Sequence, residues 1–554
     1  MTPAEQILTA VMATRPTTKT QFDQARAGIC GQLKIQQMPN RELLEAYRRL
    51  VKKKKIVADK IIENFLRKAE IRSLSGIAVV TSLLKPYACP GECVYCPTEK
   101  RMPKSYIATE PAAARALALK FSPYEQMRQR VLMLEKNGHR TDKIEYIVKG
   151  GTWNAYTLGY QYWFILESFR AANEIRRRNP PAAQYSEHTP VSELQEALER
   201  EQRRNETAKH RIIGLTLETR PDAISPRTIG HLRRQGCTRV ELGLQAPDDR
   251  ILALIKRGHT VEQFRAAMLL LRQAGFKVDL HFMPDLPGTT PAHDVEMYAS
   301  LFSDPGLKPD MVKIYPSMVV KSAELYQWFL DGRYKPYGDT PELAEALIKM
   351  KLATPRYCRL SRLIRDIPAN EISGGNAVTN LRELLAARLK KDNKRCVCLR
   401  CREIGRQQPL SPPDSAPELF IDKYKTTGGT EYFLSFEDQK RTAVFGFLRL
   451  RLPDLGQTAA VPALKKLYES LPEIRQAAFI RELHVYGQLV GIGQRDHKSS
   501  QHKGVGKKLM AAAERIARRG GYRKIAVISG VGVRDYYRRL GYRKSGSYLA
   551  KKLA

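Results

Sequence analysis

Three cysteines with the spacing C-x3-C-x2-C are the residues of this sequence most clearly suited to chemistry: Cys89, Cys93 and Cys96. They offer three thiolates to a metal site and no fourth. A structural zinc site is closed by four protein ligands, whereas a [4Fe-4S] cluster held by three cysteines leaves one iron open to a substrate or cofactor. A zinc site with a distant fourth ligand stays open as an alternative, because paired cysteines recur in zinc sites. We interpret the three as ligands of an iron–sulfur cluster with an open iron.

A second group of cysteines lies more than 300 residues downstream, at Cys396, Cys398 and Cys401. Three thiols within six residues of a basic stretch predict a metal site, and zinc is favoured over iron. The fourth ligand is not evident. Cys358 is a candidate, although a lone cysteine is more often a small buried apolar residue.

Length and charge limit the classes of protein that fit. A chain of 554 residues is long enough for two to four domains. Its 94 Lys and Arg against 57 Asp and Glu give a net charge of +37, which favours a polyanionic partner, nucleic acid first, over a merely basic soluble protein. Residues 41–72 hold 11 basic and 5 acidic residues, including Lys52, Lys53, Lys54 and Lys55. This run is either a solvated face or a phosphate-binding surface.

Features of membrane or exported proteins are not found in the sequence. It has no run of 18 apolar residues and no long amphipathic helix with bulky aromatics on one face. Residues 1–6 lack a basic leader followed by an apolar stretch, and the nine cysteines are clustered as for metals rather than spaced as for disulfides. We expect a cytoplasmic protein with no membrane partner.

The elements that must position these residues begin with helices at 4–12, 22–35 and 40–72, the last with Asn40 as its N-cap. Short β-branched runs separated by helical stretches then follow, at 77–84, 143–148, 211–217, 238–244, 277–283 and 311–315. Six such βα units predict a parallel sheet, in which chemistry gathers at the carboxyl ends of the strands. Residues 318–390 are predicted to be rich in helix.

Polar and glycine residues follow five successive strands. The cysteines follow the first strand, and the later strand ends carry Gly150, Gly151, Thr152, Glu218, Arg220, Gln245 and the segment 284–288. A glycine pair alone is usually a tight turn. Five successive strand ends of this kind favour a single site.

The cysteine spacing and this order of strand ends resemble the radical S-adenosylmethionine (SAM) enzymes. The resemblance implies a partial (βα)6 barrel whose open iron binds SAM and reduces it to a 5′-deoxyadenosyl radical, with the electron coming from an electron donor. It assigns Gly150, Gly151 and Thr152 to the loop at the SAM amino group. It assigns Glu218 and Arg220 to contacts with the ribose and carboxylate, and Gln245 to the same cofactor.

A second catalytic domain is predicted after the linker 405–418. Strands fall within 430–452 and at 480–486, a helix spans 460–470, and Gln501, Gly504 and Gly506 form a Q-x-x-G-x-G turn before a helix that runs to 519. Backbone N–H groups at such a turn suit a pyrophosphate.

With a strand at 524–529 and the segment 533–542, this region resembles the GNAT acetyltransferases. The resemblance implies acetyl-CoA bound by the main chain of Glu482, Leu483, His484 and Val485 and by the loop of Gln501, Gly504, Val505, Gly506 and Lys507. Tyr536 and Tyr537 are then catalytic candidates, Tyr537 protonating or steadying the leaving sulfur. Core packing is the alternative for this tyrosine pair.

The order of these parts resembles the family of the Elongator catalytic subunit, as do the local texts LETRPD, RELHVYG and QHKGVGKKLM. The resemblance implies synthesis of 5-carboxymethyluridine at the wobble position of tRNA: the radical abstracts hydrogen from the acetyl-CoA methyl, the carbon radical adds to uridine C5, and the thioester is hydrolysed. Lys143 corresponds to a family position that contacts acetyl-CoA. Without the resemblance it is a solvent lysine that starts a strand. The expected partner is the anticodon stem-loop, contacted by Lys52–Lys55 and by Arg356, Arg359, Arg362 and Arg365, and accessory Elongator-type subunits are not required.

The expected organisation is a basic helical region (1–75), a radical SAM core (76–317), a helical and zinc-binding module (318–404), a linker (405–418) and a GNAT domain (419–554). Two other functions stay open. One is a protein lysine acetyltransferase with a structural iron–sulfur domain, and the other is a non-catalytic tRNA-binding scaffold. Neither of them needs an open cluster together with a SAM-type glycine loop.

Overall fold

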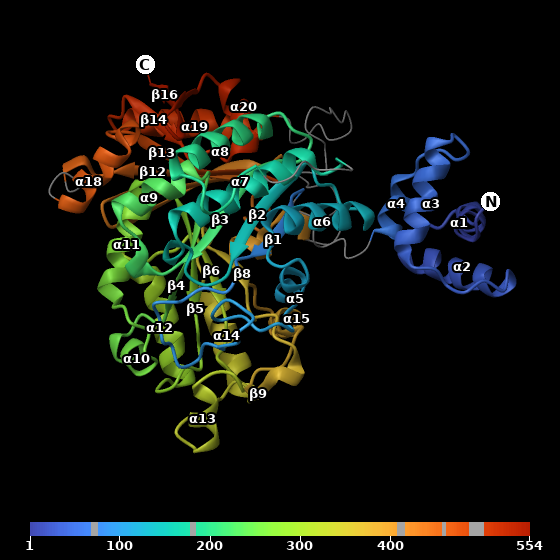
Figure 1. Cartoon of the computed structure of the whole chain (residues 1–554), viewed down its shortest axis with the longest axis horizontal. Coiled ribbons are helices and arrows are strands. Elements are labelled where there is room, and N and C mark those ends of the chain that lie inside the picture. Colours follow the sequence, from blue (N-terminus) through green and yellow to red (C-terminus); the bar gives the residue numbers. More distant parts are fainter. Residues whose placement is uncertain (68–75, 178–183, 407–415, 457–460, 487–503, 554) are drawn as a thin grey trace.

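The computed structural model describes residues 1–67, 76–177, 184–406, 416–456, 461–486 and 504–553. A small helical unit lies at one side, a parallel sheet covered by helices forms the centre, and a mostly antiparallel sheet packs at one end of the parallel sheet (Figure 1). No described helix has the length and apolar character that crossing a membrane would require.

The N-terminal unit consists of α1 (Pro3–Ala13), α2 (Lys19–Gln32), α3 (Asn40–Lys52) and α4 (Lys60–Leu66) around an apolar core of its own. The prediction of one helix over 40–72 is wrong. The helix ends at Lys52, and Lys54 takes a left-handed φ of 54°. Asn40 is also not the N-cap, which is Pro39. Its side chain instead accepts from Arg26 and donates to the carbonyl of Phe65, so it ties α3 to α2 and α4.

The central sheet confirms the six predicted parallel strands. They are β1 (Ala78–Leu83), β2 (Lys143–Lys149), β3 (Arg211–Thr219), β4 (Arg239–Gln245), β5 (Lys277–Phe282) and β6 (Met311–Ile314), adjacent in chain order. A seventh parallel strand, β8 (Arg359–Arg362), pairs with β6. It lies in the stretch predicted to be rich in helix, and its sequence RLSR has no apolar run that marks a buried strand.

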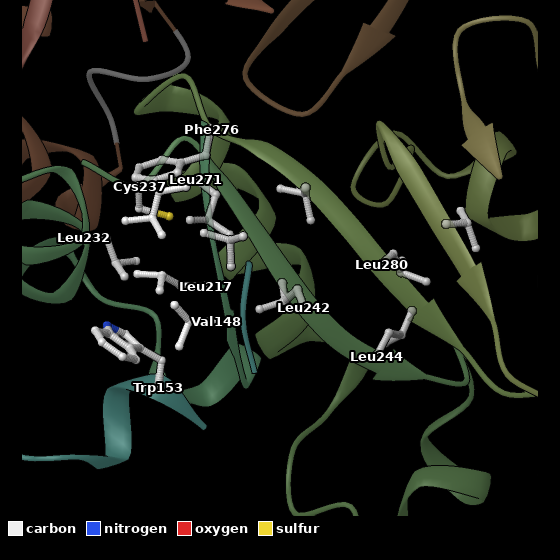
Figure 2. Packing of buried hydrophobic residues seen from close by; sticks show 14 of the residues in the cluster. Val148, Trp153, Leu217, Leu232, Cys237, Leu242, Leu244, Leu271, Phe276 and Leu280 are labelled. Carbon is white, nitrogen blue, oxygen red and sulfur yellow. The ribbon is translucent and has the colours of Figure 1, made fainter. Parts of the chain in front are cut away.

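Helices cover the outer face of this sheet: α5 (Pro111–Ala118), α6 (Pro123–Lys136), α7 (Leu158–Glu174), α8 (Val191–Asn205), α9 (Pro226–Arg234), α10 (Asp249–Leu254), α11 (Val261–Gln273), α12 (Pro291–Ser303) and α14 (Pro341–Ala353). Leu217, Leu242 and Leu280 of the strands pack with Leu232 and Leu271 of the helices (Figure 2). Because strand side chains alternate, the polar residues between these leucines face the interior of the curved sheet.

Residues after β6 add β7 (Met318–Val320), α13 (Leu325–Leu330), β9 (Ile372–Gly375), α15 (Leu381–Lys391) and α16 (Leu399–Arg402). β7 and β9 pair with each other in a separate antiparallel ribbon.

The C-terminal sheet has the order β10 (Glu418–Thr426), β11 (Gly429–Glu437), β12 (Val444–Pro453), β13 (Ala478–Val485), β14 (Lys524–Val527), β16 (Tyr548–Lys552) and β15 (Arg543–Ser545). Its helices are α18 (Pro462–Ser470), α19 (Val505–Arg519) and α20 (Arg534–Arg538). All strand pairs are antiparallel except β13 with β14. The predicted strands and helices of this region are confirmed, and β10, β15 and β16 are additional.

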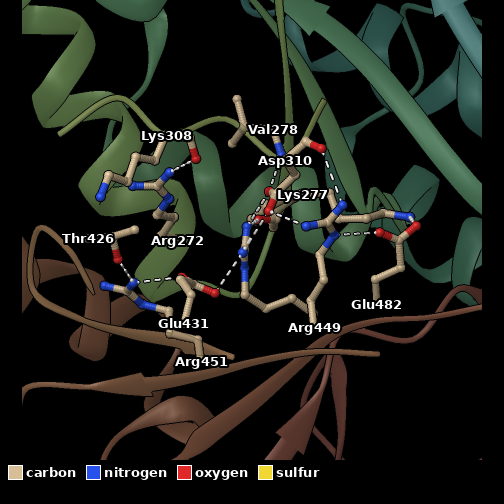
Figure 3. Close-up of polar contacts among 12 residues, drawn as sticks. Arg272, Lys277, Val278, Lys308, Asp310, Thr426, Glu431, Arg449, Arg451 and Glu482 are labelled. Atoms are coloured by element: carbon tan, nitrogen blue, oxygen red, sulfur yellow. Dashed lines mark hydrogen bonds and ion pairs between the residues drawn. The ribbon is translucent and has the colours of Figure 1, made fainter. Parts of the chain in front are cut away.

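A network of buried charges joins the two sheets (Figure 3). Asp310, just before β6, pairs with Arg481 of β13 at 3.0 Å, and Arg481 also reaches Glu431 of β11 at 3.0 Å. Glu482 accepts from Arg449 at 2.9 Å and from Lys277, the first residue of β5, at 3.1 Å. The amino ends of the parallel strands are therefore fixed against the C-terminal sheet.

Candidate functional site

A single cavity of about 1210 Å³ runs through the interior of the parallel sheet. Cys89, Cys93 and Cys96 line it near the carboxyl ends of the strands, and Glu482 and Tyr537 of the C-terminal domain line it near their amino ends. The two predicted cofactor sites, which lie about 400 residues apart in sequence, thus open into one continuous space.

The cysteine loop follows β1, and its three thiols face this space. Cys93 is buried, and Cys89 and Cys96 are partly exposed. Among the described residues the three sulfurs do not all come within 4.8 Å of one another, as the ligands of one zinc ion must. A cluster bonds each cysteine to a different iron, so this wider arrangement together with an open fourth side suits a [4Fe-4S] group.

Arg257 is a buried cation beside the loop that sequence reasoning missed. Its Nη1 donates to Cys93 Sγ at 3.5 Å, and its Nη2 donates to the carbonyl of Gly243 at 2.6 Å. The neighbouring Cys96 thiol and this guanidinium lower the pKa of Cys93, which favours the thiolate that a metal needs. Arg257 lies in a loop after α10, and nothing in its local sequence indicates contact with the cysteines.

The glycine pair after β2 adopts backbone conformations that other residues avoid. Gly150 has φ of 135° and Gly151 φ of 87°, and a Cβ on Gly150 would lie 2.8 Å from the Cβ of Leu84. Thr152 is buried, and its Oγ1 lies 3.9 Å from Cys89 Sγ. The predicted loop therefore lies beside the cysteines.

Glu218, Gln245 and Arg220 also line the cavity. Glu218 accepts from the hydroxyl of Tyr106 at 3.0 Å, and Gln245 ends β4 with a left-handed φ of 78°. Arg220 already has an ion-pair partner within the protein, because its guanidinium lies 2.9 Å from the Asp222 carboxylate. Its Nη1 is buried without a hydrogen-bond partner, lying 2.2 Å from where a Cβ on Gly91 would stand. The glycine at position 91 leaves room for the guanidinium as it stands.

The C-terminal part of the cavity is a gap between two strands. β13 pairs with β12 throughout Glu482–Val485, but its ladder with β14 covers only Ala478–Ile480. Among the described residues, the edge of β13 facing β14 is therefore unpaired beyond that point, which leaves main-chain groups for a ligand. Leu483 and His484 line the cavity here. The Glu482 side chain is bound to Arg449 and Lys277, so only its main chain is available.

The predicted pyrophosphate turn leads into α19. Gly504 is its N-cap with φ of 95°, and Val505, Gly506 and Lys507 form its first turn. A Cβ on Gly506 would lie 2.6 Å from Tyr536 Oη, so that tyrosine stands against the turn. Tyr537 is buried among apolar residues and still lines the cavity. Gln501 lies outside the described residues.

Cys396, Cys398 and Cys401 come together as predicted, with all three sulfurs within 4.8 Å of one another. This spacing suits a single zinc ion, since two sulfurs at about 2.3 Å from one metal lie about 4 Å apart. The Cys358 thiol is not in the group. The backbone carbonyl of Cys358 accepts from the N–H of Leu399, which fixes the start of α16.

The two groups of basic residues predicted to contact phosphates differ in their exposure and in their partners within the protein. Lys52, Lys53, Lys54 and Lys55 are all exposed at the end of α3. The arginines at 356–365 are bound within the protein: Arg359 pairs with Glu403 at 3.1 Å and Arg365 with Glu110 at 2.7 Å. Arg362 pairs with Asp366, and Arg356 donates to the carbonyl of Arg441. These guanidiniums already have partners in the protein, and contact of this arginine segment with tRNA phosphates stays a prediction.

Lys143 begins β2 at the end of the sheet that faces the C-terminal domain, and desolvation lowers the pKa of its ammonium group. Other inward-facing residues were missed altogether: Lys149, Glu241, His281 and Lys313. The available signal was the alternation in β4, where Arg239, Glu241, Gly243 and Gln245 alternate with apolar residues.

Comparison with known proteins finds three family matches in order along the chain. Residues 84–301 match the radical SAM superfamily, 309–391 the Radical_SAM C-terminal domain and 405–542 the acetyltransferase (GNAT) family. The chain is 41% identical over 506 residues to the tRNA uridine(34) acetyltransferase of Methanocaldococcus infernus, covering 89% of each chain. It is 37% identical to Elongator complex protein 3 of Danio rerio, covering 88% of this chain and 86% of that one. The chain belongs to the Elongator protein 3 family.

A solved structure of the family agrees with the fold. The archaeal Methanocaldococcus infernus Elp3 with an N-terminal deletion matches with a TM-score of 0.70 and 37% identity, covering 86% of this chain and all of that one. This member of the Elongator protein 3 family is therefore a radical SAM partial barrel joined to a GNAT domain. The first implies a [4Fe-4S] cluster and SAM, and the second implies acetyl-CoA.

Proposed function

We propose that this protein modifies tRNA, forming 5-carboxymethyluridine at the wobble uridine from SAM and acetyl-CoA. The observation that carries the proposal is the continuous cavity, lined at one end by Cys89, Cys93 and Cys96 and at the other by β13 and Tyr537. Relatives that align with nearly the whole chain are named for acetyl transfer to uridine 34 of tRNA.

The chemistry explains why two sites must share one space. Uridine C5 is not a nucleophile that attacks a thioester, so ordinary acetyl transfer does not form this carbon–carbon bond. When bound, the cluster and SAM supply a 5′-deoxyadenosyl radical able to take hydrogen from a methyl group. The residues of this chain then hold the acetyl-CoA and the uridine within reach of that chemistry and exclude bulk water.

Several of the predicted residues have a part in this proposal. Lys143 and the main chain of β13 hold acetyl-CoA, and the first turn of α19 holds its pyrophosphate at the positive end of the helix dipole. Tyr537 faces the leaving sulfur. Cys396, Cys398 and Cys401 hold a structural zinc ion, and Lys52–Lys55 contact tRNA phosphates.

The test is mass spectrometry of nucleosides from tRNA incubated anaerobically with the protein, SAM, a reductant and isotopically labelled acetyl-CoA. We expect labelled carboxymethyluridine from the wild type and none from Cys93→Ser. Cys237→Ser, which changes a buried cysteine on the outer side of the sheet, is the matched control and keeps the activity. Acetylated lysine in added protein, with no deoxyadenosine and no modified uridine, would instead identify a protein acetyltransferase.

A further inference from the structure

A layer of charged side chains crosses the interior of the parallel sheet near the carboxyl ends of its strands. The members of this interior layer, each from a different strand and each lining the cavity, are Lys149, Glu218, Glu241, His281 and Lys313. Glu241 is fully buried, and Lys313 and His281 are more than nine-tenths buried. Charges this deep in a fold need partners, and the interior layer satisfies only some of them.

The partners of Glu241 gather on one of its two oxygens. Lys149 and Lys313 both form ion pairs with Oε2, and His281 Nε2 lies 3.4 Å from the same atom. The other oxygen, Oε1, is buried and has no hydrogen-bond partner. The two ammonium groups keep Glu241 ionised, because they hold the pKa of its carboxyl well below the usual range. Oε1 is therefore a buried, unpaired acceptor on a side chain that lines the cavity, and leaving it so costs free energy that a donor would recover.

The neighbours of this oxygen decide which donor fits. Glu218, Glu241 and His281 together resemble a site for a divalent metal ion. A metal would have to displace two lysine ammonium groups that already balance the carboxylates, so a cation is disfavoured. A neutral N–H group flanked by carbonyl oxygens suits the site better. The carboxylate oxygen accepts from the N–H, and the lysines donate to the carbonyls.

The Watson–Crick edge of uracil has this pattern, with N3–H between the O2 and O4 carbonyls. Cytosine has an acceptor at N3, which would face the carboxylate oxygen with no proton between them. Unpaired RNA bases are commonly read by this edge while the ring stacks on an aromatic side chain. Tyr315 supplies a ring that lines the cavity 5.4 Å from His281, measured between ring centres.

We propose that the interior layer reads the wobble base, with Glu241 Oε1 accepting N3–H and Lys149 and Lys313 donating to the two carbonyls. The inference rests on the proposed function, because it names the residues that choose the base. Held by this edge, uracil turns its C5–C6 edge away from the interior layer and toward the rest of the cavity. Selection of the base and exposure of C5 then follow from one set of contacts.

The experiment is a two-by-two comparison of wild type and Glu241→Gln on anticodon stem-loop RNAs carrying uridine or 3-methyluridine at the wobble position. For the wild type, methylation of N3 removes the donor and should slow product formation about 10- to 100-fold. In Glu241→Gln the amide oxygen should turn to the two ammonium groups and leave the NH2 group facing N3–H, so the reaction of uridine should slow by a similar factor and N3 methylation should then cost little more. RNA affinity, measured by fluorescence anisotropy, should change far less, because phosphate contacts dominate it.

A control variant and a comparison that needs only the wild-type protein complete the experiment. Glu167→Gln changes a buried carboxylate on α7 that pairs with Arg170 outside the cavity, and it should leave the preference for uridine intact. If Glu241→Gln does not fold, wild type acting on a 3-methyluridine RNA as fast as on uridine overturns the inference by itself. The inference is also overturned if N3 methylation slows Glu241→Gln by the same factor as it slows wild type, because the two changes would then act independently. No product from wild type on uridine would contradict the proposed function instead.

Discussion

At the scale of single residues, Arg257 is the group expected to set the electronic properties of the cluster site. Its guanidinium donates to Cys93 Sγ and is buried. Hydrogen bonds and positive charge at a ligand sulfur stabilise the reduced cluster. Arg257→Met should therefore shift the midpoint potential of the reconstituted cluster to more negative values, as followed by electron paramagnetic resonance during a redox titration.

The charge and the packing at this position can be separated. Arg257→Lys should shift the potential less than methionine does, because it keeps the cation. Arg250→Met, on a side chain that is 84% exposed in the neighbouring α10, should leave the potential unchanged. Equal potentials for Arg257→Met and wild type would show that the contact with Cys93 does not influence the cluster.

Asp285, which follows β5, predicts a pH dependence of stability. Burial raises the pKa of its carboxyl to about 7, although Oδ1 accepts from the N–H of Tyr337 at 2.9 Å. A folded-state pKa above the unfolded value means that the folded protein binds the extra proton, so stability falls as pH rises from about 4 to 7. Asp285→Asn keeps an acceptor and removes the titration. As pH rises through that range, the free energy of unfolding of Asp285→Asn should increase relative to that of wild type by up to about 4 kcal/mol, as measured in denaturant titrations. A difference between the two proteins that does not change with pH would contradict this assignment.

At the scale of elements, the glycine loop after β2 depends on one backbone position. Gly150→Ala places a Cβ 2.8 Å from Leu84 at a φ of 135°, so we expect a loss of about 1–3 kcal/mol in stability and weaker SAM binding by calorimetry. Gly28→Ala, in α2 with no atom within 4 Å of the new Cβ, should be neutral or stabilising by up to about 1 kcal/mol. Unchanged SAM affinity in Gly150→Ala would show that the loop tolerates the change.

The exposed lysines at the end of α3 belong to the same scale. Replacing Lys52–Lys55 by alanine should weaken tRNA binding and reduce the slope of log affinity against log salt by up to about 3, if each lysine contacts a phosphate. The matched control replaces Lys465 and Lys466, which are exposed on α18 in the C-terminal domain. An unchanged salt slope in the Lys52–Lys55 variant would mean that this run is only a solvated surface.

The elements also show which parts of the structure can be predicted from sequence. The six parallel strands and the GNAT helices were accessible because their apolar periodicity is local. β8 was not, since RLSR is a strand only through its pairing with β6. The break after Lys52 depends on a left-handed residue in a run that favours helix. Arg257 lies beyond prediction for a further reason: its partner Cys93 comes from another loop, and only the folded sheet brings the two together. The alternation in β4 could have placed Glu241 on the inward face, but its partner Lys149 comes from another strand.

At the scale of the whole molecule, the cavity exists only while the two sheets are held in register. Asp310, Arg481, Glu431, Arg449 and Glu482 are buried or nearly so, and they connect the amino ends of β5 and β6 to β11, β12 and β13 (Figure 3). Such a network contributes little net stability compared with apolar packing, but losing one member leaves an uncompensated charge. Its main effect is thus to fix one arrangement of the two catalytic halves.

Asp310→Asn tests this directly. Arg481 then loses one of its two carboxylate partners and keeps only Glu431 in this buried network, so we expect a loss of about 3–5 kcal/mol and a lower unfolding temperature by calorimetry. The GNAT domain should separate as an earlier transition, because the interface is weakened while its own apolar core is intact. Asp331→Asn breaks an exposed pair with Arg333 and should leave the melting profile unchanged. A single transition in Asp310→Asn at the wild-type temperature would show that apolar contacts alone hold the halves together, and that the charged network does not position the shared cavity.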